Sequence, residues 1–404
     1  LLAALYVAIT VIFQHSPCCA AVLSFPPRLL FHVYDIPERL LLGGVKKYRL
    51  NGCLQREATY AGYALESKFP GMVKESRYHT ADPSTADYYI VPHWARCVYT
   101  AIKKLKGNSG MSSKDLIGRY LTKIIAHVGE AYPYLNKSKG HDHILASPRD
   151  FGRCPLRPTQ NFTSVQNYGH ASTMKVSLPL PCADYCSSNR VTRRFAIGRD
   201  MVVPQFSVGK SVAYFLSLHC EQSEAPASCA ERVYNARSVF HRRYLFVFRG
   251  SIGNGKVRKI LHPLYKDTPQ AVFSGIHLPA EEAMEELMAA RYCLLPDGWA
   301  PWSHRWIDAL MAGCVPVVIS DTFVPPFGAR FSHYYLHVSV EEAADGKLAD
   351  DLGNLHWMEF RKVYERLQEV RHRIIFNERP APGDGLDTMV DILWERKMTG
   401  CVCG

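Results

Sequence analysis

Short apolar runs alternate with helix-like patterns along most of the chain. Apolar runs typical of buried strands lie at 29–34, 87–92, 143–146, 244–248, 271–274, 292–295 and 315–320. Apolar residues recur at helical spacing over 57–69, 116–128, 281–290, 303–312 and 355–376. Strands that are apolar throughout and alternate with helices are typical of parallel sheets covered on both faces. The pattern therefore predicts an α/β fold with one parallel sheet in each half, and Asn354 is expected to cap the last helix.

The composition of two segments indicates where the domain boundaries lie. Residues 151–189 are rich in Pro, Ser, Asn and Cys, so we expect irregular structure there. The segment 205–238 follows the first half and is expected to connect it to the second. These boundaries predict an N-terminal domain at 28–238, a C-terminal domain at 239–396 and a tail at 397–404.

The first residues form an apolar run, Leu1–Phe13, which ends in polar residues and proline. The run is shorter than the roughly 20 residues that a helix needs to cross a bilayer. It fits the core of a signal peptide or the end of a truncated signal anchor, and we assign residues 1–27 to such a segment and its linker. The alternative is a buried first helix or strand.

The chain has 13 cysteines in 404 residues, which is many for a reduced cytosolic enzyme and suits an oxidising compartment. Glycosylation sequons at Asn136 and Asn161 agree with entry into the secretory pathway. Disulfides, with no pairing assigned, are expected among Cys154, Cys182, Cys186, Cys220 and Cys229. Zinc at the Cys182/Cys186 pair is the alternative, but no second pair with ligand spacing follows. Cys293 and Cys314 lie in strand-like sequence and are expected to be buried thiols.

Lys and Arg outnumber Asp and Glu by 48 to 37, which gives a net charge of +11. Such a balance favours phosphorylated ligands, other polyanions or a membrane surface. Nucleic acid is not an expected partner, because the arginine pairs at 193–194 and 242–243 are isolated and no recognisable module surrounds them.

A glycine-rich loop follows the strand-like run at 244–248. Its glycines, Gly250 among them, let backbone N–H groups approach a phosphate closely. The cations Arg249, Lys256 and Arg258 can neutralise a diphosphate. The loop nearly matches the phosphate loop of nucleotide triphosphatases, but Val257 stands where a hydroxyl should hold magnesium. A nucleotide triphosphatase is therefore a remote alternative function. The other alternative is that the loop is an ordinary turn that binds no ligand.

A second candidate segment, 292–321, has the pattern strand, glycine–proline loop, helix, tight turn, strand. The loop lies at the carboxyl end of a strand, where ligands bind in open α/β sheets. Ser303 is expected to begin the helix, with Arg305 and Asp308 on one side of its first turn. A cation and a carboxylate placed so suit a nucleotide sugar, the arginine on the diphosphate and the carboxylate on ribose. The alternative is a surface ion pair.

These segments belong to an ordered series that resembles the exostosin-like glycosyltransferases, family 47 of that enzyme class. The series is FHVYDIP (31–37), SRYHTADPSTADYYIVP (76–92), GHDHILASPRDFG (140–152), GRDMVVPQFS (198–207), RRYLFVFRG (242–250), the 292–321 segment and PPFG (325–328). The GWAPWS stretch at 298–303 is most similar to the plant branch acting on xylan-like polymers. Trp299 and Ala300 depart from the Gly-Asp-Thr-Pro version of other plant members.

The resemblance implies a GT-B fold, with two Rossmann-like domains whose parallel sheets face a cleft. It implies an inverting enzyme that moves a sugar from a UDP-sugar to a polysaccharide or glycoprotein glycan. It also implies Golgi residence as a type II single-pass protein with a lumenal catalytic domain. Arg249, Ser303, Arg305 and Asp308 fall on the donor-site positions proposed for the family.

An inverting transfer needs one base for the acceptor proton, and we expect it in the N-terminal half. His93 and Asp142 are the chosen candidates, ahead of His143 and Asp150. The alternative for each is a structural hydrogen bond.

The chain contains no Asp-x-Asp pair of the kind that holds Mn²⁺ in metal-dependent transferases. We therefore expect no essential metal, no cofactor besides the UDP-sugar co-substrate, and cations that stabilise the leaving group instead. The main alternative function is a catalytically silent scaffold or carbohydrate-binding subunit of a glycan synthase complex. A glycosyltransferase complex partner is a further candidate, which the sequence does not identify.

Overall fold

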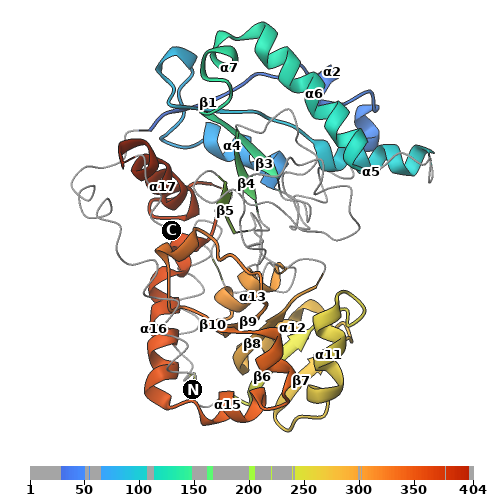
Figure 1. The fold of residues 1–404 in the computed structure, drawn as a ribbon, viewed down its shortest axis with the longest axis vertical. Helices are drawn as coiled ribbons and strands as arrows, with labels where there is room; N and C mark the ends of the chain where they lie inside the picture. The colour runs from blue at the N-terminus through green and yellow to red at the C-terminus, as the bar shows by residue number, and fades with distance from the viewer. Residues whose placement is uncertain are drawn as a thin grey trace.

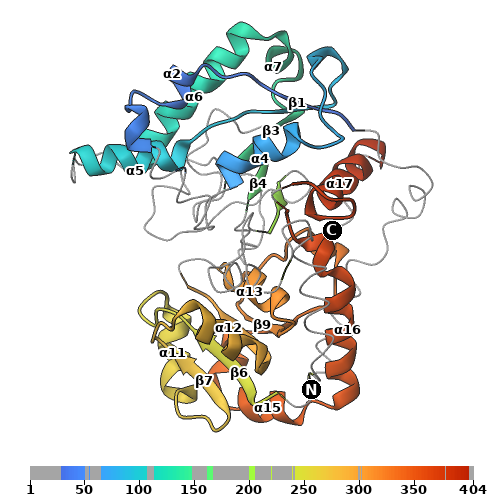
Figure 2. The same cartoon turned by 180° about the vertical axis from the view of Figure 1, so that it is seen from behind.

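Two units, each built around a parallel five-stranded sheet, lie at opposite ends of the molecule (Figures 1 and 2). The computed structural model describes residues 29–50, 54, 65–106, 113–147, 162–166, 200–204, 220, 239, 242–298, 301, 303–377 and 379–399. The predicted fold class, α/β with two parallel-sheet units, is confirmed. The predicted N-terminal segment at 1–27 lies outside the described residues.

The N-terminal sheet has the strand order β1-β2-β3-β4-β5, and every pairing is parallel. Its strands are β1 (Phe31–Val33), β2 (Tyr88–Ile90), β3 (His143–Ser147), β4 (Thr163–Gln166) and β5 (Met201–Val202). The helices around it are α2 (Glu38–Leu41), α4 (Leu65–Lys74), the 3-10 turn η3 (Pro83–Thr85), α5 (Ala95–Lys106), α6 (Ser113–Ala131) and α7 (Pro133–Ser138).

Alternation along these strands buries both faces of the sheet. Tyr34, Val91 and Leu145 belong to an apolar cluster beneath α5 and α6. Ile90 and Ile144, on the other face, belong to a cluster that includes α4 and continues into the C-terminal unit. A sheet covered on both faces explains why its strands are short apolar runs.

The C-terminal sheet has the strand order β10-β9-β8-β6-β7. Its strands are β6 (Tyr244–Arg249), β7 (Ala271–Ser274), β8 (Ala290–Pro296), β9 (Val315–Ile319) and β10 (Leu336–Val338). Its helices are α11 (Lys256–Tyr265), α12 (Ala280–Met288), α13 (Arg305–Met311), the 3-10 turn η6 (Gly328–Arg330), α14 (Val340–Ala344), α15 (Leu348–Asn354), α16 (Trp357–Ile374) and α17 (Gly385–Thr399). The chain steps from β6 to β7 on one side and then to β8 on the other, so the topological switch point lies between β6 and β8.

Helix α17 follows the C-terminal sheet in sequence but lies against the N-terminal unit (Figure 1). Asp387 accepts hydrogen bonds from Arg77, at 2.8 Å, and from the Tyr78 hydroxyl, at 2.9 Å. Lys397 pairs with Asp87. The helix therefore ties the two units together, and it runs past residue 396, where the sequence places the end of the C-terminal domain.

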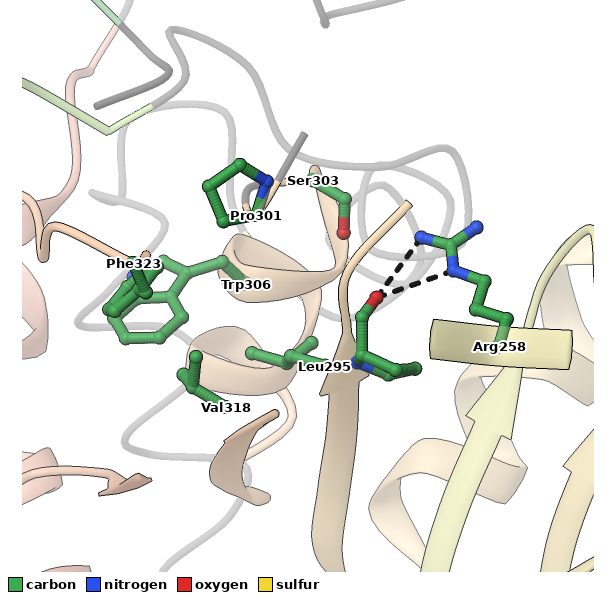
Figure 3. A pocket seen from close by; sticks show the side chains of 8 residues that line it. Arg258, Leu295, Pro301, Ser303, Trp306, Val318 and Phe323 are labelled. Atoms are coloured by element: carbon green, nitrogen blue, oxygen red, sulfur yellow. Dashed lines mark hydrogen bonds between the residues drawn. The ribbon is translucent and has the colours of Figure 1, made fainter. Parts of the chain in front are cut away.

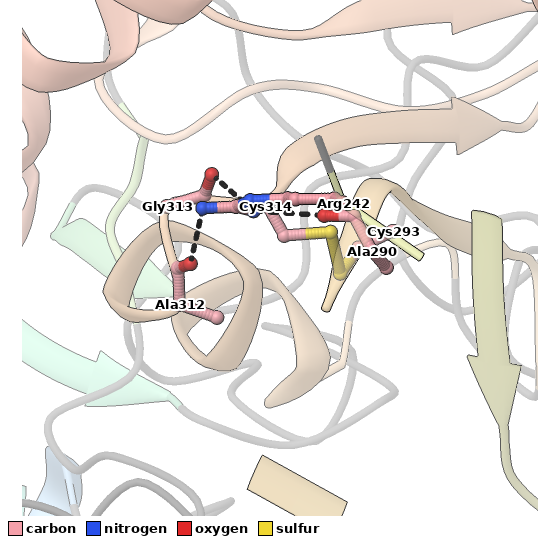
Figure 4. Close-up of a disulfide and its surroundings, with 6 residues drawn as sticks. All are labelled: Arg242, Ala290, Cys293, Ala312, Gly313 and Cys314. Carbon is pink, nitrogen blue, oxygen red and sulfur yellow. Dashed lines mark hydrogen bonds between the residues drawn. A yellow bond between two sulfur atoms is a disulfide. The ribbon is translucent and has the colours of Figure 1, made fainter. Parts of the chain in front are cut away.

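A disulfide joins neighbouring strands β8 and β9 (Figure 4). Cys293 and Cys314 are bonded to each other, with their Cα atoms 5.7 Å apart. The two cysteines are buried, as predicted, but the prediction that they are thiols is wrong. Cys314 immediately precedes β9, and the parallel pairing of β8 with β9 brings it within bonding distance of Cys293. Cys220 is also disulfide-bonded, as expected, and so is Cys97.

Several local predictions are also corrected. Strand β4 lies within 151–189, where irregular structure was expected, because its pairing with β3 and β5 organises a segment with no clear periodicity. The cap of α16 is His356, whose side chain accepts the Met358 N–H, while Asn354 ends the preceding helix. Among the helices of the described residues, none combines the length and apolar character that a membrane span needs.

Candidate functional site

The candidate site lies at the switch point, where β6 and β8 end beside each other. The loop 250–255 follows β6, and the loop 297–304 follows β8. In open α/β sheets, ligands bind outside the carboxyl ends of the strands at such a point. The topology thus brings together the two segments that the sequence analysis singled out separately.

The Phe248 ring, near the end of β6, lies beneath two guanidinium groups. The Arg258 guanidinium carbon is 5.2 Å from the ring centroid, and that of Arg305 is 5.4 Å away. Arg258 comes from α11 and Arg305 from α13, so helices that follow different strands send cations to the same ring. A buried aromatic face is a favourable support for cations that are withdrawn from water.

Arg305 is held over the end of β6. Its Nε donates to the main-chain oxygen of Arg249 at 2.6 Å. A Cβ on Gly250 would come within 2.2 Å of the Arg305 Nη2, so only glycine leaves room for the guanidinium. This contact connects two of the predicted donor-site positions directly.

Arg258 ties the two loops together (Figure 3). Its Nε and Nη2 donate to the main-chain oxygen of Pro296, each at 3.3 Å, as Figure 3 shows. Its Nη1 donates to the main-chain oxygen of Ser251 at 3.3 Å. The guanidinium packs over Gly298, and Gly298 in turn meets Gly255, where a Cβ would lie 2.5 Å from the Gly298 oxygen. The two loops are therefore held as one piece by a cation and by two residues without side chains.

Burial and mutual repulsion shape the electrostatics of this cluster. Burial lowers the pKa of Arg258 to about 10, with a further lowering from Arg305 and an opposing effect of Asp297. Burial also lowers the pKa of Arg305, against the effect of Asp308. Desolvation, followed by the Arg305 and Arg258 guanidinium groups, lowers the pKa of His304, although about half of its side chain (49%) is exposed to solvent. At neutral pH the site presents charged guanidinium groups beside a neutral imidazole, which suits an anionic ligand.

Arg249 forms an ion pair with Glu286 of α12. Its Nε and Nη2 donate to the two carboxylate oxygens, each at 2.6 Å. Its Nη1 donates to the main-chain oxygen of Ile276 at 3.3 Å. The side chain thus has fixed partners within the protein, which the sequence alone did not indicate.

The other predicted donor-site residues surround this cluster. Lys256 is exposed and begins α11. Ser303 lines a small pocket with Trp306 and Phe323 (Figure 3). Helix α13 begins at Arg305, with His304 as its N-cap residue, and not at Ser303 as predicted. Asp308 is buried in the first turn of α13, 4.0 Å from the His304 Nε2.

His93 follows β2, at the carboxyl edge of the N-terminal sheet. Its imidazole is 3% exposed, and burial lowers its pKa to about 4. Nε2 donates to the Ala146 oxygen at 2.8 Å, and Nδ1 accepts the Ala95 N–H at 3.4 Å. Glu66 lies 3.7 Å from Nδ1. The buried ring is therefore neutral at pH 7, with both nitrogens bonded within the protein.

Asp142 immediately precedes β3, at the opposite edge of the same sheet. Its Oδ1 lies 2.6 Å from His143 Nδ1, and His143 Nε2 lies 2.8 Å from the Tyr34 hydroxyl. Burial works to raise the pKa of the Asp142 carboxyl, but hydrogen bonds from His143 and Ser138 outweigh it and leave that pKa lowered. The structure does not bring Asp142 and His93 together.

Asn136 is exposed on α7, where its Nδ2 donates to the Gly129 oxygen at 2.9 Å. Asn161 lies outside the described residues. Within the described ranges, no group of three or more His, Cys, Asp or Glu side chains is arranged to hold a metal ion.

Fold and site together define an α/β protein with a cationic site at a switch point between parallel strands. The model of the exostosin GT47 domain matches residues 26–345, so the chain belongs to the exostosin GT47 family. The predicted enzyme class, a glycosyltransferase, is confirmed by this membership. Membership of this family rules out the remote alternative, a nucleotide triphosphatase with a phosphate loop.

Several curated proteins from plants are similar to this chain. A rice protein named "Probable glucuronosyltransferase GUT1" is 24% identical over 91% of this chain and 81% of its own length. The Arabidopsis protein "Probable glucuronoxylan glucuronosyltransferase IRX7" is 23% identical over 90% of this chain and 76% of its own. "Probable beta-1,4-xylosyltransferase IRX10L", also from Arabidopsis, is 26% identical over 78% and 68%. The predicted resemblance to the xylan-type branch is confirmed.

A solved structure of HepE from Anabaena in complex with UDP-glucose also matches most of the chain. The two sequences are 8% identical, and the match covers 92% of this chain and 99% of the HepE chain, with a TM-score of 0.32.

Proposed function

We propose that this glycosyltransferase moves a sugar from a UDP-sugar to a polysaccharide or glycoprotein glycan with inversion at the anomeric carbon. The observation that carries the proposal is the convergence of Arg249, Arg258 and Arg305 on the ends of β6 and β8. Names of relatives such as IRX7 and IRX10L favour a xylan-like acceptor.

The main requirement of this reaction on the donor site is electrostatic stabilisation of the leaving group. The acceptor hydroxyl oxygen bonds to the anomeric carbon while the bond from that carbon to the diphosphate oxygen breaks, and UDP leaves with the bonding pair. Guanidinium groups fixed beforehand at the leaving oxygens stabilise the charge as it develops. Arg258 and Arg305 are held by main-chain oxygens and the Phe248 ring, so they need not reorganise during transfer.

The acceptor proton passes to a base, for which His93 and Asp142 stay the candidates. His93 lies at the carboxyl edge of its sheet, but it must leave its bond to Ala146 to reach an acceptor. Asp142 lies at the amino edge and is bonded to His143. Removal of the true base abolishes transfer and leaves UDP binding intact, whereas unchanged turnover in both His93→Asn and Asp142→Asn rejects both.

We also propose that the enzyme needs no metal, because arginine side chains supply the positive potential. Transfer is expected to persist in EDTA. Loss of activity that Mn²⁺ restores would contradict this.

The proposed location is the lumenal side of the Golgi membrane, with the N-terminal apolar segment as anchor. Expression in a eukaryotic host should give a glycosylated chain whose mass falls after endoglycosidase treatment. The shift should shrink in Asn136→Gln and Asn161→Gln. A chain without glycans in wild type argues against the lumenal location.

The experiment that tests the function is a calorimetric screen of UDP-sugars, followed by transfer assays with xylan and other oligosaccharide acceptors. A donor that binds and is transferred supports the proposal. A silent scaffold subunit of a glycan synthase would neither bind nor hydrolyse any UDP-sugar, and would need a transferase partner for activity.

A further inference from the structure

Glu286 is a buried carboxylate beside the candidate site that no sequence motif contains. Its side chain is 9% exposed, and both of its oxygens accept hydrogen bonds from the Arg249 guanidinium at 2.6 Å. A carboxylate withdrawn from water is costly unless it is paired and hydrogen-bonded. The two-point pair meets that requirement, so the position of Glu286 is fixed by Arg249 and that of Arg249 by Glu286.

The pair with Glu286 leaves some N–H groups of the Arg249 guanidinium available. A guanidinium carries five N–H groups in one plane. Two of them reach Glu286, and one reaches the Ile276 oxygen. The remaining two belong to the terminal nitrogens, one on each, and the Arg249 side chain is 23% exposed. Guanidinium N–H groups that are not bonded within the protein can donate to phosphate oxygens.

Arg249 is also the point at which the two halves of the site meet. It ends β6 at the switch point, and its main-chain oxygen accepts the Arg305 Nε at 2.6 Å. Helix α12, which carries Glu286, packs against β6 and β8. Glu286 therefore fixes the side chain of Arg249, and the main-chain oxygen of Arg249 in turn fixes Arg305.

We propose that Glu286 is a positioning residue that holds the available N–H groups of Arg249 toward the diphosphate of a nucleoside-diphosphate sugar. The inference rests on the proposed function. The alternative is a simpler role, in which Glu286 only neutralises the charge of Arg249. The two roles differ in sign: loss of a positioning group weakens diphosphate binding, whereas loss of a cancelling charge strengthens it.

The test measures UDP binding by calorimetry in the full chain. Glu286→Ala and Glu286→Gln are each expected to weaken UDP binding about tenfold, because a misplaced guanidinium loses its alignment with the phosphate. Glu286→Asp keeps the carboxylate with a shorter reach and should fall between these variants and wild type. Glu285→Ala, on the exposed side of the same helix, is the matched control and should bind UDP as wild type does.

A double-mutant cycle with Arg249→Ala decides whether Glu286 acts through Arg249. If it does, adding Glu286→Ala to Arg249→Ala weakens UDP binding no further. Losses that add, or tighter binding in Glu286→Gln, overturn the inference, and so does unchanged binding in Glu286→Gln. Melting temperatures are recorded alongside, and if the alanine variant does not fold, the glutamine and aspartate variants carry the test. A wild-type chain that binds no UDP or UDP-sugar rejects the proposed function instead.

Discussion

The Arg305 guanidinium occupies the space that a side chain on Gly250 would need. An added Cβ would lie 2.2 Å from the Arg305 Nη2 and 2.7 Å from its Cζ. Gly250 is therefore required by a neighbouring cation and not by its own backbone conformation. Because the obstructing atoms are the far end of a flexible side chain, the chain can accept a methyl group there by displacing Arg305.

Gly250→Ala is accordingly expected to separate binding from stability. The unfolding free energy should stay within about 1 kcal/mol of wild type, because only the end of one side chain must move. UDP affinity should fall about tenfold, since Arg305 loses its position over β6. Calorimetry and urea unfolding measure the two effects. Gly253→Ala is the control in the same loop, where the nearest atom to a new Cβ is the Ser251 Oγ at 3.9 Å. Wild-type UDP affinity in Gly250→Ala would contradict the expectation.

Gly255→Ala should behave in the opposite way. Gly255 has φ +104°, and a Cβ there would meet the main-chain oxygen of Gly298 at 2.5 Å. Neither the backbone conformation nor the obstructing backbone can yield cheaply, so we expect a loss of roughly 1–3 kcal/mol in unfolding free energy. Urea unfolding measures it against the same Gly253→Ala control. Equal stability of the two variants would show that the loops are not held together at this contact.

The carboxyl ends of β6 and β8 could be predicted from the sequence, because each strand is an apolar run that leads into a loop containing glycine. That the two ends are neighbours depends on strand order, which the local pattern does not contain. The Arg249–Glu286 pair spans 37 residues, and Glu286 lies in a helix with acidic residues on several sides. Only the packing of α12 against β6 distinguishes it from them.

Asp142 shows where more could have been extracted from the sequence. It directly precedes the apolar run of β3, so it lies at the amino end of a parallel strand. Ligands gather at the carboxyl ends in such sheets. His93 follows its strand and lies at the expected edge, but its burial depends on α4 and on β3, which no local pattern specifies.

The disulfide between Cys293 and Cys314 closes the segment that contains the loop 297–304 and α13. Both cysteines are buried, at 2% and 0% exposure, so the bond should resist reductant in the folded protein. The double variant Cys293→Ala/Cys314→Ala is expected to lose about 2–4 kcal/mol of unfolding free energy. Urea unfolding measures the loss. Alkylation followed by mass spectrometry, with and without denaturant, provides the accessibility control. Labelling of both cysteines without reductant would contradict the bond.

Burial of His93 makes stability depend on pH. Because burial lowers its pKa to about 4 from an unfolded value of 6.5, the unfolded chain binds a proton between these pH values that the folded chain does not. The stabilisation is complete above pH 6.5 and is lost as the pH falls toward 4, at up to about 1.4 kcal/mol per pH unit. His93→Gln removes this titration, so its urea-unfolding free energy should fall less steeply than that of wild type between pH 6.5 and pH 4.5. If the unfolding free energies of the two proteins fell equally steeply with pH, His93 would be protonated in the folded state and its burial would not lower its pKa.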